Sequence, residues 1–298
     1  MNIHIAVIKL KAKKLTLHSK VVILTQVMSI SHTKKHTIYF EGKNTSKKGS
    51  LCVNNKNSNL KLLHFEYVTL KPKEPVSRNF HHRETVLVLL KGKCLITVKG
   101  SKYVLGPRKD VFSGKSHTLY IPPNCAFFVY PIHSFSEIAI ITAPAHYDGF
   151  SEIKRIPPRN VKMKRVGKNV YQRTVHTIIN IKKVHDSHLM VGETFNEGGR
   201  WSSFPPHRHM KSNVPYETRY EEIYFFKVNP YNKFGFIRIY NEKKESVYCI
   251  KNNDCAVVTD GYHPVCAVPG STVYYLWAMV GKYSKVINHY DNAFRDIS

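Results

Sequence analysis

The stretch that decides the fold reads FPPHRHMKSNVPYETRYEEIYFF and runs from Phe204 to Phe226. It holds two histidines one residue apart, His207 and His209, and then a run rich in β-branched and aromatic residues that carries Glu222. Alternate side chains of a strand point to one face, with Cα atoms roughly 6–7 Å apart, so a His-x-His pair can direct two imidazoles at one metal ion. A carboxylate on the next strand can add a third ligand, and His263 in TDGYHPV is a fourth candidate.

The charge balance of the whole chain is strongly basic. Its 298 residues, enough for one large domain or two medium ones, carry 46 Lys and Arg against 20 Asp and Glu, a formal net charge of +26. Such an excess fits a polyanion partner, because Lys and Arg release counterions from phosphates. The lysines are spread along the chain beside many Asn and Ile, however, which favours compositional bias. No RNA-binding platform or DNA-reading helix is recognisable, so we expect an anionic small substrate rather than a nucleic acid.

The cysteines and the apolar runs indicate the cellular compartment of the protein. There is no CxxC pair, and most cysteines sit inside apolar runs, which is typical of buried free thiols in a reducing compartment. No apolar run approaches the roughly 18 residues that span a bilayer. We therefore expect a cytoplasmic protein with no membrane association. The six cysteines are Cys52, Cys94, Cys125, Cys249, Cys255 and Cys266.

Residues 1–50 form a basic N-terminal extension with short apolar patches. A secretory signal peptide would need a longer apolar core and a small-residue cleavage site. A transit peptide would fit the lack of acidic residues before Met28, but that segment has no arginine and little serine. A third interpretation, which we favour, is that Met28 is the natural start.

Two β-rich halves follow, at residues 51–150 and 181–298. In both, short apolar runs alternate with Gly and Pro at roughly 8–12-residue spacing, which is typical of antiparallel sandwiches and barrels. The halves share an order of hairpin, Gly turn and closing apolar strand, a weak internal repeat. Residues 151–180 are basic and broken by Pro and Gly, which predicts an extended connector. Its basic residues are expected to face solvent; the alternative is that Arg165 or Arg173 contacts an anionic ligand.

The first half offers a weaker set of metal ligands. His81 and His82 are adjacent, so on a strand they point to opposite faces, and Glu84 follows. The segment IPPNCAFFV has no histidine where the second half has His263. We expect residues 51–150 to be a scaffold without metal ligands.

Longer motifs resemble one family. The runs WSSFPPHRH, EEIYFF, FGFIRIY, GYHPV and VPGSTVYYLWAMVG, with ETVLVLLKGKCLITVKG in the first half, are similar to the bicupin 5-deoxy-glucuronate isomerases of myo-inositol catabolism. That family is related to ketol-isomerases of deoxy-hexosulose uronates. The resemblance covers roughly residues 51–298. It implies two tandem double-stranded β-helix domains of the jelly-roll type, and conversion of 5-deoxy-D-glucuronate to 5-dehydro-2-deoxy-D-gluconate.

The resemblance also implies a ligand set of His207, His209, Glu222 and His263 for one divalent ion. Zn, Mn, Fe and Ni all suit three imidazoles and a carboxylate. The family pattern places the carboxylate immediately before Ile-Tyr, which selects Glu222 over Glu221. Thr259 and Asp260 depart from the pattern, because they replace the Pro and basic residue usual before Gly-Tyr-His.

An aldose–ketose isomerase also needs a general base and a cation for the substrate carboxylate. Glu217, Tyr240 and Glu221 are candidates for the base by their proximity in sequence. Arg238 is the candidate cation, since it shares a strand face with Tyr240; the alternative is a surface arginine.

Tyr262 and Trp201 are expected to be packing residues. Two other functions stay open, a related uronate ketol-isomerase and a metal-dependent sugar-binding cupin that does not turn over its ligand. A homo-oligomer is also possible.

Overall fold

A computed structural model describes residues 37–42, 50–133, 135–145, 152–180, 189–283 and 285–297. Residues His36–Ser298 form one compact unit. No helix in the described ranges is long and apolar enough to cross a membrane. The helices described there are short 3₁₀ turns, η2 (Pro158–Asn160), η3 (Asn169–Tyr171) and η4 (Asn292–Ile297). The predicted all-β architecture is confirmed.

The first half is a nine-stranded sheet with the order β10-β7-β5-β9-β3-β2, to which β4, β6 and β8 add a second layer. Its longest strand, β5, runs from Arg83 to Val98 and pairs with β9 through its first part and with β6 and β8 through its second. The ladder is irregular where β5 passes from one layer to the other, which lets one strand close the barrel. The other strands are β2 (Ser50–Val53), β3 (His64–Leu70), β4 (Val76–Arg78), β6 (Ser101–Arg108), β7 (Thr118–Ile121), β8 (Phe127–Pro131), β9 (Ser136–Pro144) and β10 (Lys154–Ile156).

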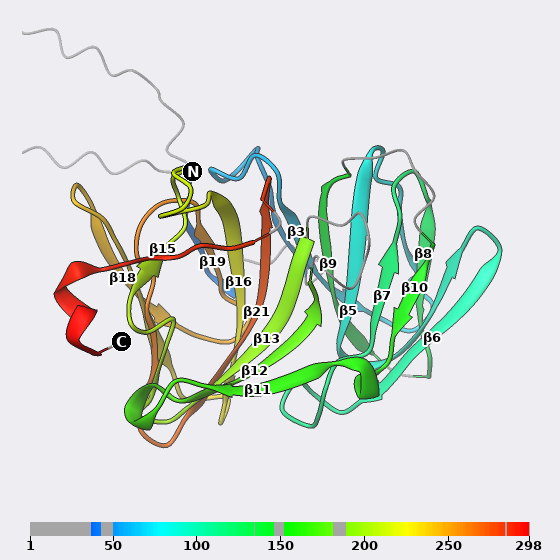
Figure 1. The fold of residues 1–298 in the computed structure, drawn as a ribbon. Coiled ribbons are helices and arrows are strands. Elements are labelled where there is room, and N and C mark those ends of the chain that lie inside the picture. The colour runs from blue at the N-terminus through cyan, green and yellow to red at the C-terminus, as the bar shows by residue number, and fades with distance from the viewer. Residues whose placement is uncertain are drawn as a thin grey trace, which may run out of the picture. The chain divides into compact units, whose positions relative to one another are not determined.

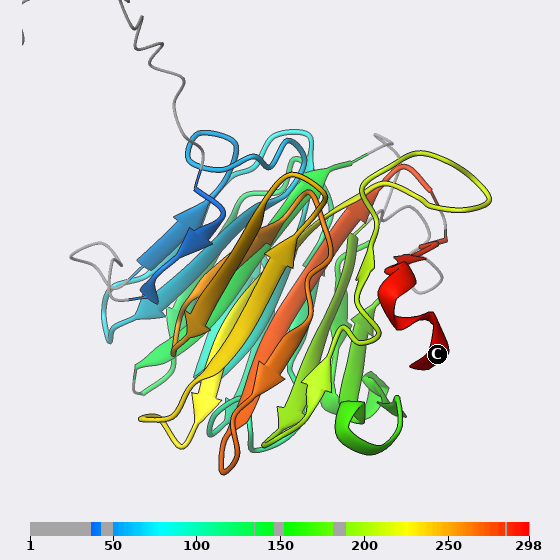
Figure 2. The same ribbon diagram turned by 90° about the vertical axis from the view of Figure 1, so that its left-hand side faces the viewer.

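The second half repeats this plan with a seven-stranded sheet of order β1-β19-β16-β21-β13-β12-β11 and a four-stranded sheet of order β14-β20-β17-β18. A small ladder of β15 and β22 lies at one end. Figure 2 shows the long strands of this half side by side, with η4 at the edge. The strands are β1 (Tyr39–Phe40), β11 (Lys162–Val166), β12 (Arg173–Ile179), β13 (Leu189–Glu197), β14 (Trp201–Ser202), β15 (His207–Arg208), β16 (Tyr220–Asn229), β17 (Gly235–Tyr240), β18 (Glu245–Ile250), β19 (Cys255–Val258), β20 (Val265–Ala267), β21 (Thr272–Gly281) and β22 (His289–Tyr290).

The segment 151–180, predicted to be an extended connector, forms strands of both sheets. β10 pairs with β7 of the first half, while β11 and β12 extend the large sheet of the second. The sequence signal was hidden because β11 is an exposed edge strand, KMKRV, and charged side chains are tolerated at a sheet edge while the backbone still pairs. The strand β1, which precedes the first half in sequence, also joins the second half by pairing with β19.

Three apolar clusters explain why the halves stay together. One lies within each barrel, and a third draws residues from both large sheets. In β16, Ile223 and Phe225 belong to this shared cluster, whereas Tyr224 and Phe226 face the interior of the second barrel. Figure 1 shows β3 and β9 of the first half beside β13 and β21 of the second. A strand buried on both faces needs a nearly continuous apolar run, which is what YEEIYFFKV supplies after its acidic pair.

Buried polar contacts also join the halves. The Arg108 guanidinium lies 2.8 Å from a carboxylate oxygen of Glu193, with both side chains almost fully buried. The Tyr274 hydroxyl donates to the same Glu193 oxygen at 2.9 Å. Lys227 and Glu137 form a second pair at 2.5 Å. These contacts fix the register of one sheet on the other.

Candidate metal centre

Four side chains gather at one end of the second barrel. His207 lies on β15 and His209 directly follows that strand. Glu222 is the third residue of β16, and His263 lies in the loop between β19 and β20. His209, Glu222 and His263 are buried, at 3%, 4% and 0% exposure. The sequence placed these residues in one site, and the fold brings them together.

The closest contacts run through the Glu222 carboxylate. Its Oε2 lies 2.9 Å from His209 Nε2 and 3.3 Å from His263 Nε2. The ligand atoms of these three residues all lie within 4.8 Å of one another. His207 lies beside this group, with its ring centroid 5.0 Å from that of His263. Three of the four predicted ligands therefore form a tight cluster, and the fourth is its neighbour.

Each of the three imidazoles is oriented by the backbone. In every case the Nδ1 atom lies at hydrogen-bond distance from a carbonyl oxygen, and because a carbonyl only accepts, Nδ1 must carry the proton. A neutral ring then presents the Nε2 lone pair toward the cluster, the arrangement that metal-binding histidines use. The Nδ1–O distance is 3.2 Å for each pair: His207 with Pro205, His209 with Tyr220 and His263 with Gly261.

The His263 Nε2 atom gives a direct test of whether a metal fits. This nitrogen is buried and makes no hydrogen bond, although it lies within ion-pairing distance of Glu222. Buried polar atoms are nearly always satisfied, so an orphaned one calls for an explanation. A cation held by the lone pair would satisfy it, and the mixed nitrogen and oxygen donors suit a divalent ion. The residues present fit such a group.

Electrostatics separates the roles of these groups. Burial, together with the neighbouring His263 and His209, lowers the pKa of His207 to about 3, so this imidazole is neutral. Burial alone would raise the pKa of Glu222, but its close contacts with the His209 and His263 imidazoles lower it to about 2. The site therefore holds a permanent carboxylate charge and a neutral imidazole at ordinary pH. Both are forms that bind a cation.

Glu221 and Glu222 are adjacent but face different parts of the molecule. Glu222 shares its face with Tyr224 of the barrel interior. Glu221 points to the first half, where its two oxygens accept the backbone N–H groups of residues 61–63 at 2.8–3.1 Å. Period-two alternation on β16 thus separates a site carboxylate from one that anchors a loop. It also leaves Glu221 remote from any role as the base.

The turn before His263 is held despite the absence of proline. Tyr240 and Tyr262 form an antiparallel bridge whose two backbone hydrogen bonds measure 3.0 and 2.8 Å. Gly261, directly before Tyr262, has φ +98°, and a Cβ there would lie 2.4 Å from the Tyr240 carbonyl oxygen. Asp260 accepts a hydrogen bond from Asn241 at 2.9 Å. Glycine and the bridge therefore present His263.

Of the three residues predicted for catalysis, Glu217 is committed to its own loop. Its Oε1 accepts the N–H groups of Met210 and Lys211 at 2.7 and 3.0 Å, and its Oε2 lies 3.3 Å from Arg208 Nε. Glu217 is 2% exposed. These contacts shape the loop that follows His209.

Arg238 and Tyr240 lie together on β17. The Arg238 side chain is 40% exposed, binds Glu245 at 2.8 Å and stacks on the Tyr240 ring, with 3.8 Å from Cζ to the centroid. The Tyr240 hydroxyl donates to Asp291 Oδ2 at 2.5 Å. Burial and then Asp291 raise the Tyr240 pKa, so the phenol keeps its proton.

The two connector arginines have other surroundings. Arg165 is exposed on the edge strand β11, and Arg173 donates to the carbonyl oxygens of Tyr171 and Phe204 at 3.3 Å. Trp201 is 38% exposed and contacts the Phe204 ring, with 5.8 Å between centroids. Tyr262 packs against the Arg208 guanidinium.

The C-terminal segment closes the site, which no sequence pattern indicated. β22 pairs with β15, so that Tyr290 lies opposite His207, with ring centroids 5.9 Å apart. The Asp291 N–H donates to the Pro206 carbonyl at 2.9 Å. Inside the barrel, the Tyr224 hydroxyl lies 3.1 Å from Ser203 Oγ. Tyr224 was visible as the residue two after Glu222, on the same strand face.

The first half departs in one respect from the scaffold without metal ligands that its sequence predicts. His81 and His82 are exposed, and they belong to no metal-type cluster among the described residues. A different group, Cys52, His64 and Glu66, does form such a cluster.

All six cysteines are free, but the expectation that they are buried is wrong for Cys52 and Cys249, which are exposed. Both occupy outward positions on strands at a sheet edge.

Comparisons with known proteins give a consistent result. The sequence pattern of the KduI/IolB family matches residues 38–297. A 5-deoxy-glucuronate isomerase from Geobacillus kaustophilus is 35% identical over 221 residues, 73% of this chain and 79% of that protein. The enzyme of that name from Bacillus subtilis is 29% identical over 238 residues, 77% and 85% of the two chains.

Solved structures agree on the fold. An IolB-like protein from Salmonella typhimurium superposes with a TM-score of 0.80 at 28% identity, covering 88% of this chain and 99% of that one. An oxalate decarboxylase from Lactobacillus farciminis gives a TM-score of 0.62 at 9% identity, over 90% and 92% of the chains. At that identity the second likeness shows the shared two-barrel fold alone.

Proposed function

Because this chain belongs to the KduI/IolB family, we propose that it is an aldose–ketose isomerase that converts 5-deoxy-D-glucuronate to 5-dehydro-2-deoxy-D-gluconate. The relatives that bear the name 5-deoxy-glucuronate isomerase cover most of the chain. The observation that carries the proposal is the convergence of His209, Glu222 and His263 beside His207. Family membership and this convergence of side chains both support the proposal.

One divalent ion, Zn, Mn, Fe or Ni, would be held in this site by His207, His209, Glu222 and His263. When bound, it supplies Lewis-acid stabilisation of negative charge on substrate oxygens. The backbone carbonyls that fix each Nδ1–H hold the three rings in place for it. Removal of such supporting contacts from known metal sites lowers metal affinity or activity by about 10- to 100-fold.

The isomerisation moves a proton from C2 to C1 of the sugar, so it needs a group that takes and returns a proton. Of the three residues predicted for catalysis, Tyr240 has the most support. Its backbone bridges Tyr262, next to His263, and its hydroxyl binds Asp291, next to Tyr290. We place the proton-transferring pair at Tyr240 and Asp291. Glu217 is better suited to shaping the loop, because both of its oxygens are engaged.

The substrate is a uronate, and Arg238 remains the proposed partner of its carboxylate. Its side chain is partly exposed beside Tyr240, so it can reach an incoming anion. Glu245 holds it in the free protein and would have to share it. An arginine is suited to this because its planar fork binds a carboxylate in a bidentate manner.

The test is an isomerase assay on purified protein loaded with Mn²⁺ or Zn²⁺, with 5-deoxy-D-glucuronate as substrate. We expect ketose product from the unmodified protein and none above background from His207→Ala or His263→Ala. The matched control is His81→Ala, an exposed histidine of the first half, which should retain full activity.

Absence of product from the loaded protein would refute the proposed reaction. Turnover of a deoxy-hexosulose uronate in its place would assign the related ketol-isomerase reaction. Stoichiometric metal in the site of a His207→Ala/His263→Ala double variant would refute the ligand set.

A further inference from the structure

A second set of metal-type side chains lies on the first barrel, on strands β2 and β3. His64 and Glu66 are one residue apart on β3, the same spacing as His207 and His209. Cys52 on β2 lies directly opposite Glu66 in the antiparallel register. Period-two alternation and strand pairing therefore direct all three side chains to one face of the sheet.

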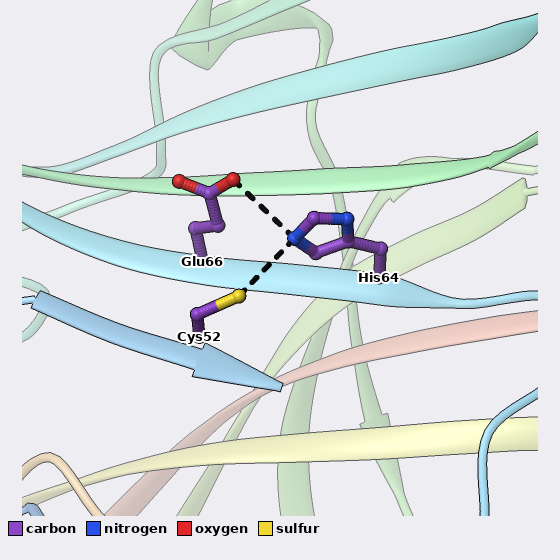
Figure 3. A group of neighbouring side chains, drawn as sticks. All are labelled: Cys52, His64 and Glu66. Atoms are coloured by element: carbon purple, nitrogen blue, oxygen red, sulfur yellow. Dashed lines mark hydrogen bonds and ion pairs between the residues drawn. The ribbon is translucent and has the colours of Figure 1, made fainter. Parts of the chain in front are cut away.

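The three side chains meet at a single atom. His64 Nε2 lies 3.4 Å from Cys52 Sγ and 3.3 Å from Glu66 Oε1, as Figure 3 shows. The ligand atoms all lie within 4.8 Å of one another. In a nucleophilic Cys-His-carboxylate triad the thiol and the carboxylate contact opposite nitrogens of the ring. Here the thiol and the carboxylate both contact Nε2 of His64, so the three ligand atoms converge as they would around one metal ion.

Neighbouring groups hold the carboxylate in this position. Arg78 Nε and an Nη atom donate to Glu66 Oε2 at 2.9 and 2.7 Å, which leaves Oε1 directed at His64. The His64 ring packs edge-on against Phe80, with 5.4 Å between centroids. Glu66 is 7% exposed. The carboxylate is thus buried and oriented before any ligand arrives.

The thiol stands at the open side of the cluster. Cys52 is exposed, and Asn54 Nδ2 lies 3.3 Å from its Sγ. A hollow of about 270 Å³ adjoins the cluster and is lined by His64 and Phe80 among others. A fourth coordination position would therefore be reached from solvent.

We propose that Cys52, His64 and Glu66 form a second metal site, which takes Zn²⁺ through one sulfur, one nitrogen and one oxygen and leaves one position to water. Thiolate favours zinc and other soft ions, while imidazole and carboxylate complete a set that zinc accepts. A thiolate and a carboxylate would supply two negative charges to the ion, and the carboxylate charge is shared with Arg78. The site is distinct from the histidine centre of the second barrel in its position and in its use of sulfur.

Cobalt substitution distinguishes the two centres, because only the second site has a sulfur ligand. The full chain, stripped of metal under reducing conditions, is titrated with Co²⁺ and followed in the near-ultraviolet for thiolate-to-cobalt charge transfer. We expect a band that saturates at one equivalent of bound thiolate-ligated metal. Cys52→Ser should abolish it, and zinc analysis of that variant should show one equivalent fewer than in the unmodified chain.

Two variants serve as controls. Cys249→Ser removes the other exposed thiol and should leave the band unchanged. The His207→Ala/His263→Ala double variant should also keep the band, so the outcome does not depend on the proposed isomerase activity. Absence of the band from the unmodified protein, or its persistence in folded Cys52→Ser, would overturn the proposal. Circular dichroism of each variant establishes that it is folded.

Discussion

The two clusters use the same strand geometry in different surroundings. Glu222 lies two residues before Tyr224 of the second barrel's apolar cluster, and Glu66 lies two residues before Val68 of the first barrel's cluster. The histidine centre is enclosed, with His263 fully buried. The cluster of Cys52, His64 and Glu66 spans the edge strand β2 and its neighbour β3, and it opens to solvent at the exposed Cys52.

The difference in solvent exposure between the two clusters shows which contacts enclose a site in this fold. The second barrel gains a cover from its C-terminal segment, because β22 pairs with β15 beside His207. It also gains three backbone carbonyls that orient the imidazoles. The first cluster has one oriented carboxylate, held by Arg78. Enclosure suits chemistry on a sugar, since a dry site strengthens electrostatic contacts, whereas an open site suits simple binding.

The largest expected effect is on turnover by the enclosed site. Glu222→Gln removes the carboxylate shared by His209 and His263. A bound metal contributes several kcal/mol of charge stabilisation, so we expect kcat/KM to fall by about 1000-fold. The measurement is steady-state isomerase kinetics with His81→Ala as the control. A loss of less than about tenfold would argue that the carboxylate is not a ligand.

The next effect concerns the contact between the halves. Arg108→Met leaves the buried Glu193 carboxylate without its cation, which should lower the free energy of unfolding by about 3–5 kcal/mol. The double variant Arg108→Met/Glu193→Leu should lose less, because no buried charge is then unpaired. Urea denaturation measures both. The exposed Arg238–Glu245 pair is the control, and Glu245→Gln should cost less than about 1 kcal/mol. Equal losses in the single and double variants would contradict this account.

A smaller effect should separate the metal affinities. The three oriented imidazoles should make the enclosed centre bind Zn²⁺ about 10- to 100-fold more tightly than the open cluster. Stepwise addition of a chelator to the zinc-loaded protein should therefore remove the thiolate-bound ion first, while isomerase activity persists. Loss of activity before loss of the thiolate-bound metal would contradict the predicted order of the two Zn²⁺ affinities.

The smallest effect is on stability in acid. Burial alone would raise the pKa of Glu193, but Arg108 lowers it below the ordinary value of 4.5. A lowered folded-state pKa adds stability above the unfolded pKa, and that stability is lost as the pH falls through the folded value. Urea midpoints should therefore decline below about pH 4.5, less steeply in Arg108→Met/Glu193→Leu. Parallel declines would exclude Glu193 as the cause.

Strand positions and the face of each site residue could be predicted wherever one apolar period dominates. The alternation in EEIYFF separates Glu222 from Glu221, and the fold places them as expected. Residues 151–180 could not be predicted, because edge strands such as KMKRV carry charges and no apolar face. The pairing of β1 with β19 depends on contacts far apart in sequence.

For the site, local patterns predicted the side chains that cluster but not the contacts that support them. The contact of Tyr240 with Asp291 spans 51 residues, and no local sequence pattern around either residue predicts it. The cysteine cluster needs the register of β2 on β3, although the His-x-Glu spacing at His64 was visible. The exposed fraction of Cys52 likewise depends on which strand ends the sheet.

The most direct test of the central claim measures bound metal and isomerase turnover on one preparation of stripped protein as Mn²⁺ or Zn²⁺ is added back. The claim is that the His207, His209, Glu222 and His263 centre holds the ion that supports catalysis. It predicts that turnover rises in proportion to the first equivalent bound and then levels off, and that His263→Ala gives no turnover at any metal concentration. Full turnover in metal-free protein, or in His263→Ala, would contradict it.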